Sequence, residues 1–246
     1  MVCPNGGTGL PRKLGQHFLS SHGILERIAR LVCDAGKPRV LEVGPGRGAL
    51  TEKLLACASH VTAVEIDPEL VVYLRSRFAD LELVEGDALE VDFASYRPDI
   101  IAGNLPYYVA TPLIERTVRL GLPGVFLIQK EVAQRLTARP GSRDYGFLTV
   151  QTQLFATAEL MFTVPPGAFN PPPKVDSAVV RLTPRSPVEG AEELIGFLSA
   201  CFRQKRKTLR NNLRGRGAID GLAEASLRAE QLSLEQLVDL WRRTAG

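Results

Sequence analysis

The stretch GNLPYY, residues 103–108, combines groups that could hold a planar base with a primary amine. The side-chain carbonyl of Asn104 can accept a hydrogen bond, and so can the Leu105 backbone carbonyl, because Pro106 has no N–H to occupy it locally. Two acceptors can bind both amine hydrogens and release the nitrogen lone pair that is otherwise delocalised into the ring. The ring of Tyr107 can stack on a flipped-out base, for about 1–3 kcal/mol. Tyr108 points the opposite way and is expected to pack. The stretch predicts methyl transfer to an exocyclic amine of the adenine type.

A glycine-rich turn between a predicted strand and a predicted helix, VLEVGPGRGALTEKL (40–54), is a second candidate site. Gly44 and Gly46 let the backbone approach a ligand closely, and the helix start behind them offers free amides. The same spacing satisfies the dinucleotide fingerprint, with Glu65 about 20 residues further on. A nicotinamide dinucleotide is therefore a rival ligand for this turn.

Three acids at the ends of three successive predicted strands favour S-adenosylmethionine over a dinucleotide. Glu42 would repel a pyrophosphate, whereas it suits a cationic sulfonium and its amino-acid tail. Glu65 is placed to hold ribose hydroxyls, and Asp87 is placed to accept a hydrogen bond from the adenine amine. Asp67 is instead expected to cap the helix that follows it.

Short β-branched runs alternate with helical patterns over the first 184 residues, which predicts a parallel sheet covered by helices. The predicted strands are Arg39–Val43, Val61–Glu65, Leu81–Glu85, Asp99–Gly103, Val125–Gln129 and Ser177–Leu182. The predicted helices are Ala49–Ala58, Pro68–Phe78, Thr111–Leu120, Lys130–Ala138 and part of Tyr145–Ala156, after a first helix that stops by Gly36. The prolines of FNPPPK (169–174) exclude regular structure there.

After Pro184 only helical patterns recur. Apolar residues from Leu194 to Leu213 recur at helical spacing, and Ser233-Leu-Glu-Gln236 fits a capping box that opens the last helix. The fold class is thus α/β, with a domain over residues 1–184 and a small all-helical domain over residues 185–246.

The segment RQKRKTLRNNLRGR (203–216) carries seven Lys or Arg and no acid, although the whole chain has a net charge of only +3. A basic block on a mildly acidic body favours a polyanionic partner. We expect Arg203, Lys205, Arg206, Lys207 and Arg210 to contact RNA phosphates rather than to read bases.

Composition places the chain in the cytoplasm and away from membranes. No apolar run approaches the ~18–20 residues that span a bilayer, and the segment MVCPNGGTGLPRK has no apolar signal region. The four cysteines are scattered, with neither a CxxC pair nor histidine ligands nearby. We therefore expect buried or free thiols and neither a disulfide nor a structural zinc site.

Eight segments in this order and spacing resemble the ribosomal RNA adenine dimethyltransferase family, of the KsgA/RsmA type that acts on small-subunit rRNA. They are KLGQHFL (13–19), LEVGPGRGALT (41–51), VEIDPEL (64–70), EGDAL (85–89), GNLPYY (103–108), QKEVAQRL (129–136), FNPPPKVDSAVVRL (169–182) and FRQKRKTLRNNL (202–213). The resemblance implies a Rossmann-like class I methyltransferase sheet with a C-terminal helical domain.

The implied reaction uses S-adenosyl-L-methionine to place two methyl groups on the N6 amine of each of two adjacent adenosines. These lie in a hairpin near the 3′ end of small-subunit rRNA, either naked or in a pre-assembled subunit. We expect a monomeric enzyme without a metal. The implied cofactor residues are Gln16, His17, Leu19, Glu42, Gly44, Gly46, Glu65, Ile66, Asp87, Ala88 and Asn104, and the implied catalytic residues are Asn104, Leu105, Pro106 and Tyr107.

Phe169 is expected to cover the other face of the target base, with burial as a plain core residue as the alternative. His17 departs from the family's commoner asparagine, yet its side chain can still donate a hydrogen bond. Phe147 stands where many relatives carry a basic residue, which removes a phosphate contact expected there. Two alternatives remain at this stage: a large-subunit rRNA methyltransferase of the antibiotic-resistance type, and a non-catalytic nucleic-acid-binding factor.

Overall fold

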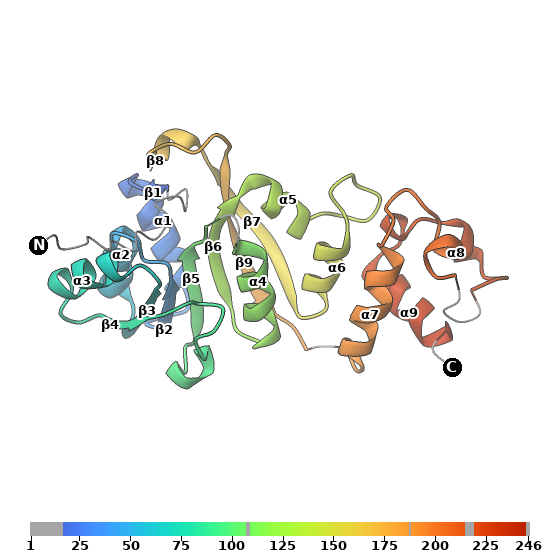
Figure 1. Ribbon diagram of the computed structural model, residues 1–246, viewed down its shortest axis with the longest axis horizontal. Coiled ribbons are helices and arrows are strands. Elements are labelled where there is room, and N and C mark those ends of the chain that lie inside the picture. The colour runs from blue at the N-terminus through green and yellow to red at the C-terminus, as the bar shows by residue number, and fades with distance from the viewer. Residues whose placement is uncertain (1–16, 107–108, 187, 215–218, 245–246) are drawn as a thin grey trace, which may run out of the picture.

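A seven-stranded sheet forms the centre of the molecule in the computed structural model, which describes residues 17–106, 109–186, 188–214 and 219–244 (Figure 1). Its strand order is β4-β3-β2-β5-β6-β9-β7. The strands are β2 (Arg39–Val43), β3 (His60–Glu65), β4 (Glu82–Glu85), β5 (Ile100–Asn104), β6 (Gly124–Gln129), β7 (Ala156–Val164) and β9 (Ser177–Pro184). The first five are parallel, whereas β9 runs antiparallel between β6 and β7. The predicted parallel α/β sheet is confirmed, with β7 as a strand that the sequence reading missed.

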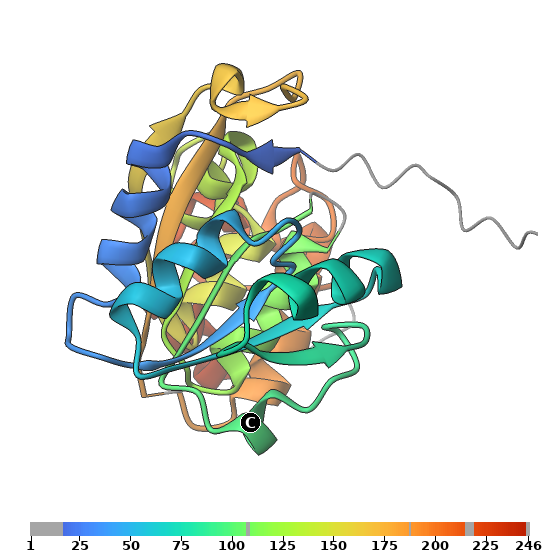
Figure 2. The same cartoon turned by 90° about the vertical axis from the view of Figure 1, so that its left-hand side faces the viewer.

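Helices cover both faces of this sheet and bury its apolar side chains (Figure 2). The helices are α1 (His22–Val32), α2 (Ala49–Cys57), α3 (Pro68–Arg77), α4 (Ala110–Arg119), α5 (Lys130–Leu136) and α6 (Phe147–Gln153). Helices α1 and α2 bury residues such as Leu25 and Leu54 against one face, and α4 to α6 bury Leu113 and Leu136 against the other. The Asp67 carboxylate accepts from the Glu69 amide at 2.9 Å, which confirms the predicted cap of α3.

A two-stranded ribbon lies over the α1 side of the sheet (Figure 1). Strands β1 (Phe18–Leu19) and β8 (Phe169–Asn170) pair antiparallel, with Leu19 opposite Phe169. The prediction that 169–174 is irregular throughout is therefore wrong for its first two residues. Both precede the run of prolines, so their backbone groups remain available for pairing.

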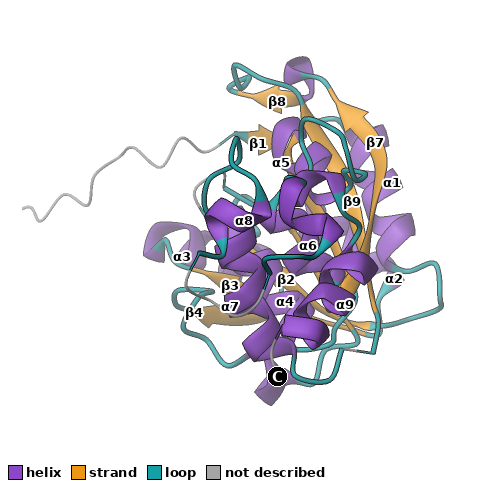
Figure 3. Ribbon diagram, turned by 90° about the vertical axis from the view of Figure 1, so that its right-hand side faces the viewer, coloured by secondary structure: helices purple, strands orange, loops and turns teal. Residues whose placement is uncertain are grey.

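The chain after β9 is helical, as predicted, and its helices gather at one end of the molecule (Figure 1), the end that faces the viewer in Figure 3. They are α7 (Ala191–Cys201), α8 (Leu209–Asn212) and α9 (Leu234–Thr244). The helical spacing from Leu194 to Leu213 does not correspond to one continuous helix, because α7 ends at Cys201. The side-chain amide of Asn212 donates to the Cys201 carbonyl at 2.7 Å and turns the chain back. Leu209 and Leu213 still enter the core, which explains their helical spacing. The Ser233–Gln236 capping box is confirmed.

A disulfide joins Cys33, which ends α1, to Cys57, the last residue of α2. The expectation of no disulfide is therefore wrong. The two helices pack side by side, which places the two Cα atoms 6.1 Å apart, within the range that a disulfide spans. A separation of 24 residues along the chain gave no sign of this contact.

No helix in the described ranges is long and apolar enough to cross a membrane.

Candidate active site

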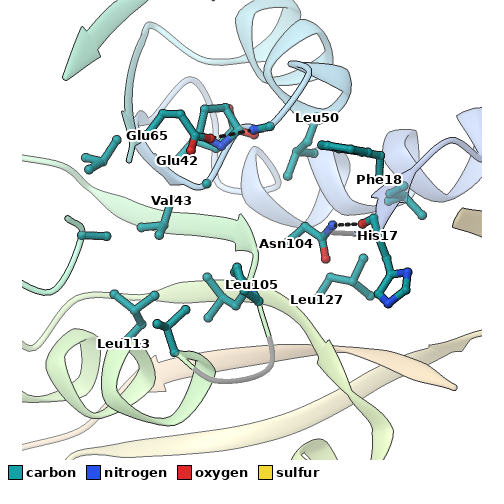
Figure 4. Close-up of a pocket in the computed structure, with 18 of the residues that line it drawn as sticks. His17, Phe18, Glu42, Val43, Leu50, Glu65, Asn104, Leu105, Leu113 and Leu127 are labelled. Carbon is teal, nitrogen blue, oxygen red and sulfur yellow. Dashed lines mark hydrogen bonds between the residues drawn. The ribbon is translucent and has the colours of Figure 1, made fainter. Parts of the chain in front are cut away.

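One pocket lies at the carboxyl ends of the parallel strands, where ligands bind in open α/β sheets (Figure 4). All of the predicted cofactor and base-binding residues that the structure describes line it. They are His17, Leu19, Glu42, Gly44, Gly46, Glu65, Ile66, Asp87, Ala88, Asn104, Leu105, Pro106 and Phe169. Two further predicted residues, Gln16 and Tyr107, and also Tyr108, lie outside the described residues.

The glycine turn after β2 presents bare backbone to this pocket. Gly44 has φ +66°, and a Cβ there would find only the Asn104 carbonyl oxygen, at 4.0 Å. Gly46 has φ +58°, and a Cβ there would press on the Phe18 ring at 3.0 Å. Both positions require the left-handed backbone that glycine adopts without strain. The turn thus leaves open space above Gly44 while it seats an aromatic ring of the N-terminal arm.

Glu65 braces the glycine turn from the end of β3. One of its carboxylate oxygens accepts from the Gly46 amide at 3.1 Å, and the other accepts from the Ile66 and Asp67 amides, each at 3.0 Å. Burial raises the pKa of this carboxyl above its ordinary value, and the three amide hydrogen bonds oppose the rise. A carboxylate has about four acceptor sites, so one remains available to a ligand hydroxyl.

Glu42 is the most deeply buried acid of the pocket, with 1% of its surface exposed. The Thr51 hydroxyl, from the first turn of α2, donates to it at 2.7 Å. Burial raises the pKa of Glu42 to about 7, the Thr51 hydrogen bond lowers it, and the charge of Glu65 adds to the rise. A cationic ligand group beside Glu42 would favour the charged carboxylate.

Asp87 lies on a loop after β4 that Arg116 of α4 fixes in place. The Arg116 guanidinium donates to the carbonyls of Ala88, at 3.0 Å, and of Leu89 and Val91. Asp87 Oδ1 accepts from the Leu89 amide at 2.8 Å, and Asp87 Oδ2 takes no part in this hydrogen bond. Arg116 is a positioning residue that no local motif had indicated.

Asn104 ends β5 with its amide held in one orientation. Its Nδ2 donates to the His17 backbone carbonyl at 3.1 Å, so its Oδ1 faces the pocket as an acceptor (Figure 4). The Pro106 carbonyl accepts from the Val109 and Ala110 amides, whereas the Leu105 carbonyl accepts no backbone hydrogen bond from the described residues. The Asn104 side-chain oxygen and the Leu105 carbonyl are thus two acceptors without a described backbone donor at the start of the NLPY stretch.

Phe169 lines the same pocket and is 6% exposed. Its strand pairs with the arm, and the His17 Nδ1–H donates to the Pro171 carbonyl at 2.9 Å. His17 therefore joins three segments, because its own carbonyl also accepts from Asn104. The His17 side chain therefore donates a hydrogen bond, as expected, although the family more commonly has asparagine at this position.

The predicted RNA-contacting residues are all exposed: Arg203, Lys205, Arg206 and Lys207 on the turn between α7 and α8, and Arg210 in α8. Lys205 donates to the Arg143 carbonyl and lies 3.9 Å from Glu230, while Arg210 pairs with Asp220 at 3.1 Å. The turn is thereby tied to the loop between α5 and α6 of the sheet domain. These residues lie apart from the pocket.

The donor set fits S-adenosylmethionine. The open backbone above Gly44, the buried acid Glu42 and the acids at the ends of β3 and β4 would hold its tail, ribose and adenine. The sheet order and this site define a class I S-adenosylmethionine-dependent methyltransferase. A family model described as "Ribosomal RNA adenine dimethylase" matches residues 9–243. The chain belongs to the ribosomal RNA adenine dimethylase family.

Individual relatives agree with this assignment. A protein of Acidobacterium capsulatum named ribosomal RNA small subunit methyltransferase A is 44% identical, over 94% of this chain and 89% of the relative. A probable enzyme of the same name from Pyrobaculum aerophilum is 45% identical, over 94% and 97%. A crystal structure of a dimethyladenosine transferase from Plasmodium falciparum superposes with a TM-score of 0.76 at 28% identity, covering 92% of this chain and 98% of that one. The 23S rRNA methyltransferase ErmE gives 0.69 at 27% identity, over 93% and 100%.

Several pocket residues were absent from the predicted set, notably Phe18, Arg47 and Ser177. Phe18 packs on Gly46, and the Arg47 guanidinium lies 5.0 Å above the Phe18 ring. Both residues lie in motifs whose other members were predicted to bind the cofactor, so their position in those motifs could have indicated that they line the pocket. Ser177 also lies in one of the family motifs, FNPPPKVDSAVVRL (169–182), but its residue type alone gave no indication of a pocket position.

Proposed function

We propose that this enzyme dimethylates the N6 amines of two adjacent adenosines in the 3′-terminal hairpin of small-subunit rRNA. The observation that carries the proposal is the pair of acceptors at the end of β5, Asn104 Oδ1 and the Leu105 carbonyl, in one pocket with the acids that suit S-adenosylmethionine. The names of the relatives that are 44% and 45% identical support the small-subunit target.

Asn104 and Leu105 act on the target amine by accepting its two N–H groups, which favours a pyramidal nitrogen with an available lone pair. Phe169, with Tyr107, holds the flipped base by stacking. The bound cofactor supplies a methyl group on a positively charged sulfur. Because that group is already a strong electrophile, orientation and proximity account for most of the rate. The methylated ammonium loses its proton readily to water, so the residues at NLPY need no strong base.

The two domains divide the work in this proposal. Residues 1–184 bind cofactor and base, and residues 185–246 bind RNA through Arg203, Lys205, Arg206, Lys207 and Arg210. The partner is small-subunit rRNA or a partly assembled small subunit in the cytoplasm, and the enzyme acts as a monomer without a metal ion.

The large-subunit alternative has less support. ErmE shares the fold at 27% identity, whereas the small-subunit relatives reach 44% and 45%. A purely binding factor would have no use for the buried acids that the pocket retains.

Mass spectrometry of rRNA from cells with and without the gene tests the proposal. We expect loss of two adjacent dimethyladenosines near the 3′ end of small-subunit rRNA, restored by the wild-type gene and not by N104A. Primer extension across large-subunit rRNA provides the comparison. Unchanged small-subunit rRNA, or a lost stop in large-subunit rRNA, contradicts the proposal.

A further inference from the structure

Ser177, the first residue of β9, is a buried polar residue in the wall of the active-site pocket. Only 2% of its surface is exposed. Its hydroxyl makes no hydrogen bond with any described residue. The oxygen is not fully enclosed by protein either, so it keeps some accessible surface. The hydroxyl therefore faces the pocket.

The other buried hydroxyls of the described residues fall into two groups, and the Ser177 hydroxyl belongs to neither. Those that form a hydrogen bond within the chain are Thr51 to Glu42, Thr62 to Glu82, Thr117 to the Leu113 carbonyl and Thr149 to the Arg135 carbonyl. The hydroxyls of Ser142, Tyr145 and Thr152 lack a partner but are enclosed by protein. Since an unsatisfied buried hydroxyl costs free energy, a hydroxyl kept at the pocket wall indicates a partner that arrives from the pocket.

Strand register places Ser177 on the base side of the pocket. Asn104 pairs with Leu127, and Leu127 pairs with Val179. Ser177 is two residues from Val179, so both side chains project from the same face of the sheet. Phe169 packs on that face with Leu127 and Val179. The cofactor acids lie the other way along the sheet, on β2 and β3 and after β4.

A buried adenine leaves two ring acceptors, N1 and N7, beside the amine that Asn104 and Leu105 hold. A base that leaves water must regain its hydrogen bonds in the site. A serine hydroxyl is a donor that rotates to suit an acceptor. Conditional on the proposed function, we propose that the Ser177 hydroxyl donates to one of these two ring nitrogens and so fixes the adenine in its plane.

The test uses S177A on small subunits reconstituted with rRNA whose synthetic 3′ hairpin carries adenosine, 1-deazaadenosine or 7-deazaadenosine at the target. We expect S177A to lower kcat/KM on adenosine about tenfold, the effect of one lost hydrogen bond. One of the two analogues should lower the wild-type kcat/KM to the same extent and should cause no further loss with S177A. Calorimetry should give the same Kd for S-adenosylmethionine in both proteins.

T117V is the matched control, because it removes a buried hydroxyl that bonds within α4 and lies outside the pocket. Full activity of S177A overturns the inference. So does a weaker cofactor Kd that accounts for the loss, or additive losses with both analogues. If the wild-type enzyme leaves adenosine unmethylated, the proposed function fails, and the inference falls with it.

Discussion

At the scale of single residues, the site depends on which polar atoms are already occupied. The Asn104 amide group donates one hydrogen bond to the His17 carbonyl, which fixes its orientation and leaves its Oδ1 as an acceptor for the substrate. The Glu65 carboxylate accepts one hydrogen bond from the glycine turn, at Gly46, and two from the Ile66 and Asp67 amides that follow β3. Glu42 has a single described hydrogen bond, from Thr51, in a fully buried position. Of these three residues, Glu42 is the one whose charge state changes near neutral pH.

The raised pKa of Glu42 makes folding stability depend on pH. Its pKa is about 7 in the fold against an ordinary 4.5, so the folded chain binds more protons than the unfolded chain between these values. The contribution is therefore present below pH 4.5 and is lost as pH rises to 7. Between pH 4.5 and 7 the wild type should lose about 3 kcal/mol of its free energy of unfolding through Glu42. E42Q cannot ionise at this position and should not show this loss.

Urea unfolding at a series of pH values measures this difference between wild type and E42Q. E82Q is the control with the opposite sign, since hydrogen bonds from His60 and Thr62 hold the pKa of Glu82 below its ordinary value. Its stabilising contribution is lost as pH falls. Parallel pH profiles for wild type and E42Q would show that the fold does not raise the pKa of Glu42.

At the scale of elements, the pocket is closed by segments that are distant in sequence. The arm at β1 meets the glycine turn through Phe18, β5 through the His17 carbonyl, and β8 through strand pairing. Helices α1 and α2 support this arrangement from below, and the Cys33–Cys57 disulfide joins their ends. The disulfide therefore stabilises the part of the fold that carries the arm and the glycine turn.

Reduction of the disulfide should lower the melting temperature. Closing a loop of 24 residues constrains the unfolded chain, which is worth about 3 kcal/mol. For a chain of this size that corresponds to roughly 6–12 °C. Calorimetric scans of the wild type with and without reductant measure the shift. The C33S/C57S variant should have the melting temperature of the reduced wild type, and reductant should not change it. Identical melting with and without reductant would mean that the two thiols are not joined in solution.

How far the sequence predicted these elements depended on the length of each pattern. Strands β2 to β6 were found because each is a run of four or more residues before a recognisable turn, although β4 is only partly buried. Strands β1 and β8 have two residues each, too few for a period to be visible. The contacts of Arg116, the Cys33–Cys57 disulfide and the pocket position of Ser177 each depend on tertiary packing, which no local pattern encodes.

At the scale of the whole molecule, the basic turn is held against the sheet domain. The Gly141 amide donates to the Glu230 carbonyl at 2.6 Å, and Lys205 donates to the Arg143 carbonyl. The exposed Arg143 of the α5–α6 loop therefore lies beside the exposed turn of residues 203–207. Positive charge from the loop and from the turn meets at this junction, so an RNA bound there would contact both segments.

Neutralising Arg206 and Lys207 should weaken RNA binding without affecting cofactor binding. Each phosphate contact contributes about 0.7–0.9 to the slope of log K against log salt, so R206Q/K207Q should flatten the slope by about 1.5. Filter binding of the rRNA hairpin between low and physiological salt measures this, and calorimetry should give an unchanged Kd for S-adenosylmethionine. R30Q/K37Q removes the same charge from α1 and the turn after it, at the far end of the molecule (Figure 1). Equal slopes for both variants would mean that net charge alone, and not this surface, attracts the RNA.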